Sequence, residues 1–84
     1  MFISGKVQGI FFRSKTRIEA REKQVSGWIG NLMDGRVEAV FEGEKVAVEK
    51  VIDFCRKGPH LAKVTRVEIF WESYTGNYRG FYIR

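Results

Sequence analysis

The dipeptide Asp34-Gly35 separates two stretches of strand character, and it constrains the possible fold more than any other feature of the chain. In residues 36–42, Val37, Ala39 and Phe41 share one face, and most of the residues between them are charged. Asp-Gly is typical of the two-residue type I′ turn, which needs a positive φ at both central residues. The sequence therefore predicts a tight β-hairpin near the middle of the chain.

Two stretches with helical periodicity flank this hairpin, one on each side. They are predicted over 12–24 and 44–57, and Gly58 and Pro59 end the second. Each has a stripe that we expect to be buried: Phe12, Thr16 and Ala20 in the first, and Val48, Val51, Ile52 and Cys55 in the second. Further strands are predicted over 2–7, 28–33, 64–72 (with Thr65, Val67, Ile69 and Trp71 on one face) and 81–83.

The predicted order is β-α-β-β-α-β with a short strand appended, which is typical of the ferredoxin-like, split βαβ arrangement of the α+β class. We expect an antiparallel sheet with both helices on one face, formed by residues 1–84 as a single domain. The chain has neither a long apolar run nor the layout of a signal peptide. A cytoplasmic protein with no membrane partner is expected.

The charged and sulfur-containing residues limit the classes of function. A formal net charge of +5 favours anionic partners, such as phosphorylated small molecules or nucleic acid. A lone cysteine, Cys55, excludes an internal disulfide, and without clustered histidines it cannot form a structural zinc site. The single histidine, His60, follows a predicted helix end. We therefore predict that Cys55 is a buried small hydrophobe and that His60 lies in a loop.

The stretch GKVQGIFFR at 5–13 is the best candidate for a binding site. Gly5 and Gly9 bracket a turn whose backbone N–H groups can converge on an anion at the start of the first helix. Arg13 lies in the first helical turn, where a cation is unfavourable for the helix dipole, and this indicates a bound anion beside it. An ordinary glycine turn followed by a surface arginine explains the same residues.

Two longer motifs make the chain resemble the acylphosphatase family. The stretch 5–13 is similar to the family's Gly-x-Val-Gln-Gly-Val-x-Phe-Arg signature, with Ile10 at a common valine position. GWIGNLMDGRVE at 27–38 is similar to its second signature, with Ile29 for valine. The resemblance covers essentially the whole chain, and GPHLAKVTRVE at 58–68 is similar to the family's entry to its fourth strand.

The resemblance implies a hydrolase that cleaves acyl phosphates to a carboxylate and inorganic phosphate, without a metal or other cofactor. It implies that the backbone amides of residues 8–13 hold the phosphate, that Arg13 anchors it, and that Asn31 orients the attacking water. The loop residues concerned are Gln8, Gly9, Ile10, Phe11, Phe12 and Arg13. We expect inorganic phosphate or sulfate to bind at the same place, no nucleic acid partner, and a monomer. Phe12 and Trp28 are interpreted as core residues.

A second hypothesis is a non-catalytic, RNA-recognition-like module, because such modules share this element order and the chain is basic and rich in aromatics. RGFYIR at 79–84 faintly echoes an RNA-recognition signature, but it lies in the terminal strand. Residues 37–41, in the central strand, offer no convincing pair of exposed aromatic side chains.

The chain departs from the family pattern at its start. Only four residues precede Gly5, fewer than family members usually carry. We therefore expect a shortened first strand, with fewer ladder hydrogen bonds and core contacts at the centre of the sheet.

Overall fold

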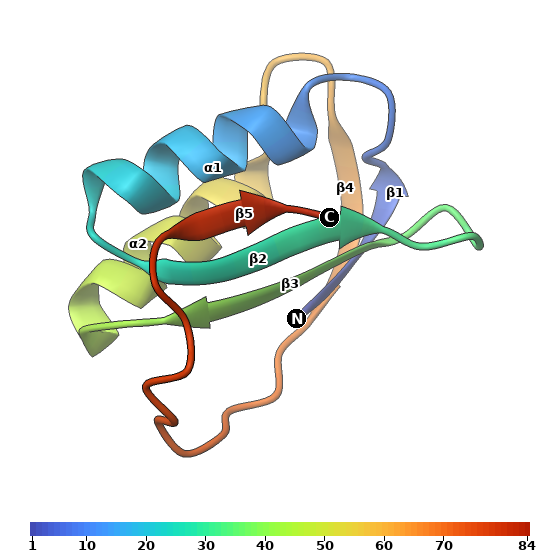
Figure 1. Ribbon diagram of the computed structural model, residues 1–84. Coiled ribbons are helices and arrows are strands. Elements are labelled where there is room, and N and C mark those ends of the chain that lie inside the picture. Colours follow the sequence, from blue (N-terminus) through green and yellow to red (C-terminus); the bar gives the residue numbers. More distant parts are fainter.

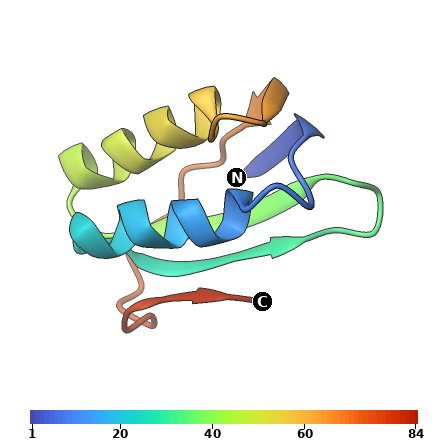
Figure 2. The ribbon, with the colours of Figure 1, turned by 90° about the horizontal axis from the view of Figure 1, so that it is seen from above.

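The computed structural model describes residues 1–84, which form two helices and a five-stranded sheet (Figure 1). The elements in chain order are β1 (Phe2–Lys6), α1 (Phe12–Glu22), β2 (Ser26–Asn31), β3 (Val37–Glu42), α2 (Lys45–Lys57), β4 (Lys63–Glu68) and β5 (Phe81–Ile83). The strands lie in the order β4-β1-β3-β2-β5. The first four are antiparallel to their neighbours, and β5 adds in parallel to β2. Both helices cover the same face of the sheet, which is plain in Figure 2, so the predicted ferredoxin-like arrangement is confirmed.

The core lies between this face and the helices, and it contains the predicted stripes. Phe12, Thr16 and Ala20 are buried in α1, and Val48, Val51, Ile52 and Cys55 are buried in α2. Burial raises the pKa of the Cys55 thiol to about 12, so this group is protonated and unreactive at neutral pH. The prediction of a buried, structural cysteine is confirmed. No helix is both long and apolar enough to cross a membrane.

The hairpin between β2 and β3 is not closed by the predicted type I′ turn, and this prediction is wrong. Gly35 has a φ of 95°, but Asp34 does not have a positive φ. The Leu32 N–H donates to the Arg36 carbonyl (2.8 Å), and the Gly35 N–H donates to the Leu32 carbonyl (3.2 Å). The loop is thus a longer one with a left-handed glycine after the turn. Asp34 acts through its carboxylate, whose hydrogen bonds from Arg36 hold its pKa below the usual value.

The fourth strand is shorter than the predicted 64–72, and it contains a β-bulge that its sequence does not predict. It ends at Glu68, and residues 69–80 form an irregular segment. The register with β1 shifts at Thr65, which has no partner there. Because of this bulge, Val64 and Val67 both pack against the core, although strict alternation would place them on opposite faces.

The first strand pairs unequally with its two neighbours. Only Phe2 and Ile3 are in register with β3, whereas all of β1 pairs with β4. Gly5, with a φ of 123°, lies within β1, and an added Cβ there would overlap the backbone oxygen of Lys63. Close approach of two strands therefore requires this glycine.

The interpretation of Trp28 as a core residue is wrong. It lies on the face of the sheet opposite Ile29, which is the core residue of this pair, and it is only half-buried. The Arg84 guanidinium covers its ring, 3.8 Å from the ring centroid. Alternation along β2 explains the difference, since adjacent residues of a strand point to opposite faces.

Candidate active site

The loop between β1 and α1 has an unusual backbone conformation. Gly9 has a φ of 73°, and Phe11, the residue that precedes α1, has a φ of 63° and a ψ of 18°. This left-handed conformation costs a bulky residue roughly 1–2 kcal/mol. The Phe11 side chain is 75% exposed, so its burial offsets little of this free-energy cost. Such strain persists where the surrounding structure imposes it, and it is concentrated at functional sites.

The same loop presents a run of backbone donors with no acceptor. No N–H group from Gln8 to Ser14 donates a hydrogen bond to another protein group. The first hydrogen bond of α1 runs from the Lys15 N–H to the Phe11 carbonyl (3.0 Å). No side chain caps the helix, and its first turn contains no acidic residue. Free N–H groups at the positive end of a helix dipole form an anion site.

Arg13 lies in the first turn of α1 beside these donors. It is half-buried, and its one hydrogen bond joins Nη1 to the carbonyl oxygen of Arg84 (3.3 Å). The Arg84 N–H in turn donates to the Ile29 carbonyl (2.8 Å), so Arg84 links Arg13 to β2. The other N–H groups of this guanidinium have no protein partner and can meet an oxyanion.

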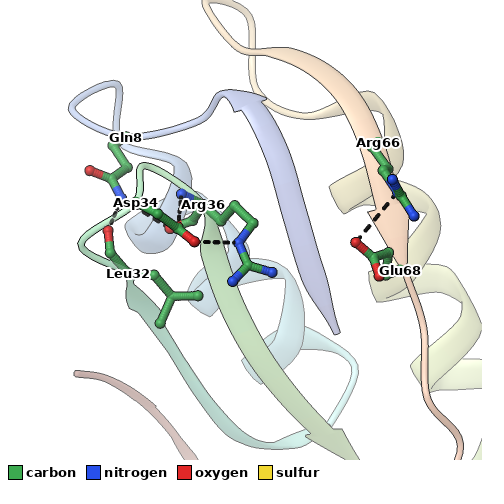
Figure 3. Close-up of polar contacts among 6 residues, drawn as sticks. All are labelled: Gln8, Leu32, Asp34, Arg36, Arg66 and Glu68. Carbon is green, nitrogen blue, oxygen red and sulfur yellow. Dashed lines mark hydrogen bonds and ion pairs between the residues drawn. The ribbon is translucent and has the colours of Figure 1, made fainter.

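Gln8 fixes the loop to the β2–β3 hairpin through its side chain (Figure 3). Its Nε2 donates to the carbonyl oxygens of Leu32 (2.8 Å) and Arg36 (2.9 Å). Figure 3 also shows the Asp34–Arg36 ion pair at the tip of that hairpin and, away from it, the Arg66–Glu68 pair on β4. The sequence predicted Gln8 only as a backbone donor, and the bracing by its side chain was missed.

Asn31 is the last residue of β2, and its side chain is exposed, with no hydrogen-bond partner in the protein. It is paired with the buried Val37, so it lies on the face of the sheet that carries the helices. The next residue, Leu32, accepts the hydrogen bond from Gln8. The fold therefore brings Asn31 to the edge of the sheet where the 8–13 loop lies, on the same face as the start of α1.

A small cavity of about 280 Å³ opens at the loop. Of the predicted residues, Gly9, Phe11, Phe12 and Arg13 line it, and the others, Gln8, Ile10 and Asn31, do not. Its lining also includes Val7, Ser14 and Ile83, which the sequence analysis missed. Ser14 could have been found from its place in the first helical turn, but Ile83 reaches the site only because β5 adds beside β2.

The contacts of Gln8 lead to a prediction about the stability of the loop. Gln8→Glu keeps the size of the side chain but replaces the only donor by a carboxylate beside two carbonyl oxygens. We expect the free energy of unfolding to fall by about 1–3 kcal/mol, because the loop loses its brace. Chemical denaturation measures the effect. Wild-type stability in this variant would contradict the bracing role.

Other candidate chemical groups lie away from this cavity. His60 is exposed in the turn after α2, as predicted, and Cys55 is buried against the Thr16 hydroxyl (3.8 Å). No group of three or more His, Cys, Asp or Glu side chains is placed to hold a metal ion.

A ferredoxin-like sheet with a run of free N–H groups and an arginine at its first helix defines a small α+β protein with a candidate oxyanion site. Comparison with known proteins identifies the particular kind. The family model described as Acylphosphatase matches residues 1–83, and the chain belongs to the acylphosphatase family.

Relatives and solved structures agree with this assignment. An acylphosphatase of Chloroflexus aurantiacus is 60% identical over 76 residues, covering 90% of this chain and 83% of the relative. One from a Roseiflexus species is 57% identical over 83 residues, covering 99% and 89%. The crystal structure of acylphosphatase from Bacillus subtilis superposes with a TM-score of 0.94 at 30% identity, covering 99% of this chain and 92% of that one. The predicted enzyme class, acylphosphatase, is confirmed.

Proposed function

We propose that the protein hydrolyses acyl phosphates to a carboxylate and inorganic phosphate at the 8–13 loop, without a metal ion. The observation that carries the proposal is the unbroken run of free N–H groups from Gln8 to Ser14 beside the Arg13 guanidinium. These donors match the three charged oxygens of a phosphoryl group, and the loop cavity of about 280 Å³ suits a small anion. The acyl part of the substrate extends outward past Phe11, which is 75% exposed.

The reaction needs positioning and charge stabilisation more than acid catalysis. A water attacks phosphorus, the new O–P bond forms as the bond to the acyl oxygen breaks, and the electron pair of that bond leaves with the carboxylate. A carboxylate is a stable leaving group, so it needs no proton from the enzyme. The loop amides and Arg13 stabilise charge on the equatorial oxygens.

Asn31 is the residue proposed to orient the water. Its carboxamide has one acceptor and two donors, and none of them is engaged by the protein. A carboxamide is not a base at neutral pH, so the water passes its proton to an oxygen of the phosphate. No free carboxylate or imidazole in the lining of the cavity offers a different route.

The first test is hydrolysis of benzoyl phosphate by the purified protein in the presence of EDTA. We expect full activity after exhaustive dialysis against the chelator, and competitive inhibition by inorganic phosphate. Activity that disappears with EDTA and returns with a divalent cation would contradict the proposed metal-independent mechanism. Absence of hydrolysis under every metal condition would contradict the proposed function.

The central strand β3 does not support the RNA-binding alternative. On the open face of the sheet it presents Glu38, Val40 and Glu42, which include two carboxylates and no aromatic ring. Phe41 faces the core and stacks on Phe81, with 5.6 Å between ring centroids. Stacking platforms for bases need exposed aromatics at such positions, and phosphates are repelled by carboxylates.

A further inference from the structure

The side chain of Phe11 gains little from the fold, although its backbone conformation is costly. A φ of 63° favours glycine and, among the other residues, asparagine over an aromatic one. The Phe11 N–H would belong to the donors of the 8–13 loop whatever the side chain, so that role does not require a phenylalanine. The ring is largely exposed, and it forms no aromatic pair within the protein. A gain that offsets the strain is therefore expected from contact with a bound molecule.

The conformation of Phe11 is held through its carbonyl group. The carbonyl oxygen accepts hydrogen bonds from the Lys15 N–H (3.0 Å) and from the Ser14 hydroxyl (3.1 Å). The next residue, Phe12, is buried and anchors the loop to the core. The Phe11 ring is therefore attached at a fixed point beside the cavity before a ligand arrives, and this lowers the entropic cost of a contact with it.

The lining of the loop cavity combines one charged group with accessible apolar side chains. Arg13 is the only charged residue in the lining. Val7 and Phe12 also line the cavity but are buried in the core. Phe11 is exposed and Ile83 is half-buried, so these two side chains can contact a ligand. In Figure 2 the end of β5, which carries Ile83, lies beside the start of α1. A ligand whose phosphoryl group engages Arg13 therefore has apolar side chains beside its remaining part.

A second anionic group on the ligand would have no counter-ion in this lining. The phosphoryl group engages Arg13, and no other cationic side chain lines the cavity. A carboxylate or a second phosphate on the acyl group would lie against Phe11 and Ile83, where its loss of hydration is costly. An apolar acyl group is stabilised when it leaves water at the same place. The lining therefore favours an uncharged, apolar acyl group.

We propose that Phe11 and Ile83 form a subsite for the acyl group, and that the enzyme prefers acyl phosphates whose acyl group is apolar, above all aromatic. The inference rests on the proposed acyl phosphate hydrolysis at the 8–13 loop and names its substrate class. The acyl group leaves the cavity along the Phe11 ring, on which an aromatic acyl group stacks, and Ile83 adds an aliphatic contact. Binding energy from this non-reacting part of the substrate raises kcat/KM.

The first test measures binding without turnover. Phenacylphosphonate and acetonylphosphonate are stable analogues of benzoyl phosphate and acetyl phosphate, in which a methylene group replaces the bridging oxygen. In isothermal titration of the full chain, phenacylphosphonate should bind about tenfold more tightly, because a methyl group cannot stack on Phe11. The succinyl analogue of the same series carries a terminal carboxylate and should bind no more tightly than acetonylphosphonate.

The second test removes the ring. Phe11→Asn keeps a residue that adopts the left-handed conformation readily. We expect the ratio of affinities for phenacylphosphonate and acetonylphosphonate to fall about fivefold, and the ratio of kcat/KM for benzoyl phosphate and acetyl phosphate to fall by the same factor. Comparison between variants cancels the different intrinsic reactivities of the two substrates.

Two controls accompany this variant. Phe11→Tyr keeps the ring and should keep both ratios. Tyr74→Asn removes a ring of nearly equal exposure, 76%, outside the loop cavity, and it should also keep both ratios. A fall of the ratios in Tyr74→Asn as large as in Phe11→Asn would overturn the assignment of the acyl group to the Phe11 ring.

The titrations also separate this inference from the proposed function. Equal affinity of the wild-type protein for the two phosphonates would overturn the subsite, and so would an unchanged ratio in Phe11→Asn. Binding of the succinyl analogue as tight as that of phenacylphosphonate would overturn the preference for an apolar acyl group. If the phosphonates bind with the expected ratios but no acyl phosphate is hydrolysed, the proposed function fails and the apolar subsite stands. Hydrolysis without any difference between the phosphonates has the reverse meaning.

Discussion

Replacement of Arg13 by alanine is expected to lower kcat/KM for benzoyl phosphate by about 10³-fold. On the proposed mechanism, Arg13 is the one side-chain cation among the donors around the phosphoryl group, and removal of one such donor costs about 10²–10³-fold. The loss of a charge-assisted, bidentate contact places the effect at the upper end. The backbone cradle from Gln8 to Ser14 would remain, so weak phosphate binding should persist.

Two further variants separate charge from geometry. Arg13→Lys keeps the positive charge but loses the planar fork, and we expect a loss intermediate between wild type and Arg13→Ala. Arg17→Ala, one turn further along α1 and outside the lining of the cavity, serves as the matched control and should retain near wild-type kinetics. If Arg13→Ala and Arg17→Ala lower kcat/KM by the same factor, both arginines act only by general attraction of anions. The assignment of Arg13 as a phosphate ligand then fails.

The helices were predictable from sequence because their burial follows from a local repeat. The α2 stripe from Val48 to Cys55 is buried as its spacing indicates. The sheet was less predictable, since strand details depend on partners distant in sequence. The bulge at Thr65 depends on the register of β1 against β4. Asp34-Gly35 does not form a type I′ turn, because it lies in a longer loop. Gln8 donates hydrogen bonds to the carbonyl groups at both ends of that loop.

In the candidate site, too, some features follow from the local sequence and others depend on residues distant in the chain. Glycines before Arg13 predict a loop with free N–H groups, and this property is local. The left-handed Phe11 could not be predicted, because nothing about a phenylalanine favours a φ of 63°. The contact of Arg13 with the Arg84 carbonyl and the presence of Ile83 in the cavity depend on β5 lying beside β2. Such contacts between the two ends of the chain have no sequence signature.

Replacement of Asn31 by alanine is expected to lower kcat by about 10²-fold and to change KM little. On the proposed mechanism, Asn31 contacts the attacking water and not the phosphate, and misplacement of a reactant by about 1 Å can cost 10²-fold. An interaction made only with the reacting water is absent from ground-state binding, so its loss appears in turnover. Inhibition by inorganic phosphate should therefore be the same as in wild type.

Asn31→Asp provides a sharper contrast than the alanine variant. The carboxylate can still accept a hydrogen bond from water, but its negative charge lies beside a phosphate, so KM should rise together with the fall in kcat. Asn77→Ala, in the exposed segment 69–80, is the matched control and should leave both constants unchanged. A higher KM with unchanged kcat in Asn31→Ala would instead make Asn31 a phosphate ligand. The attacking water would then be oriented by the substrate and the loop amides alone.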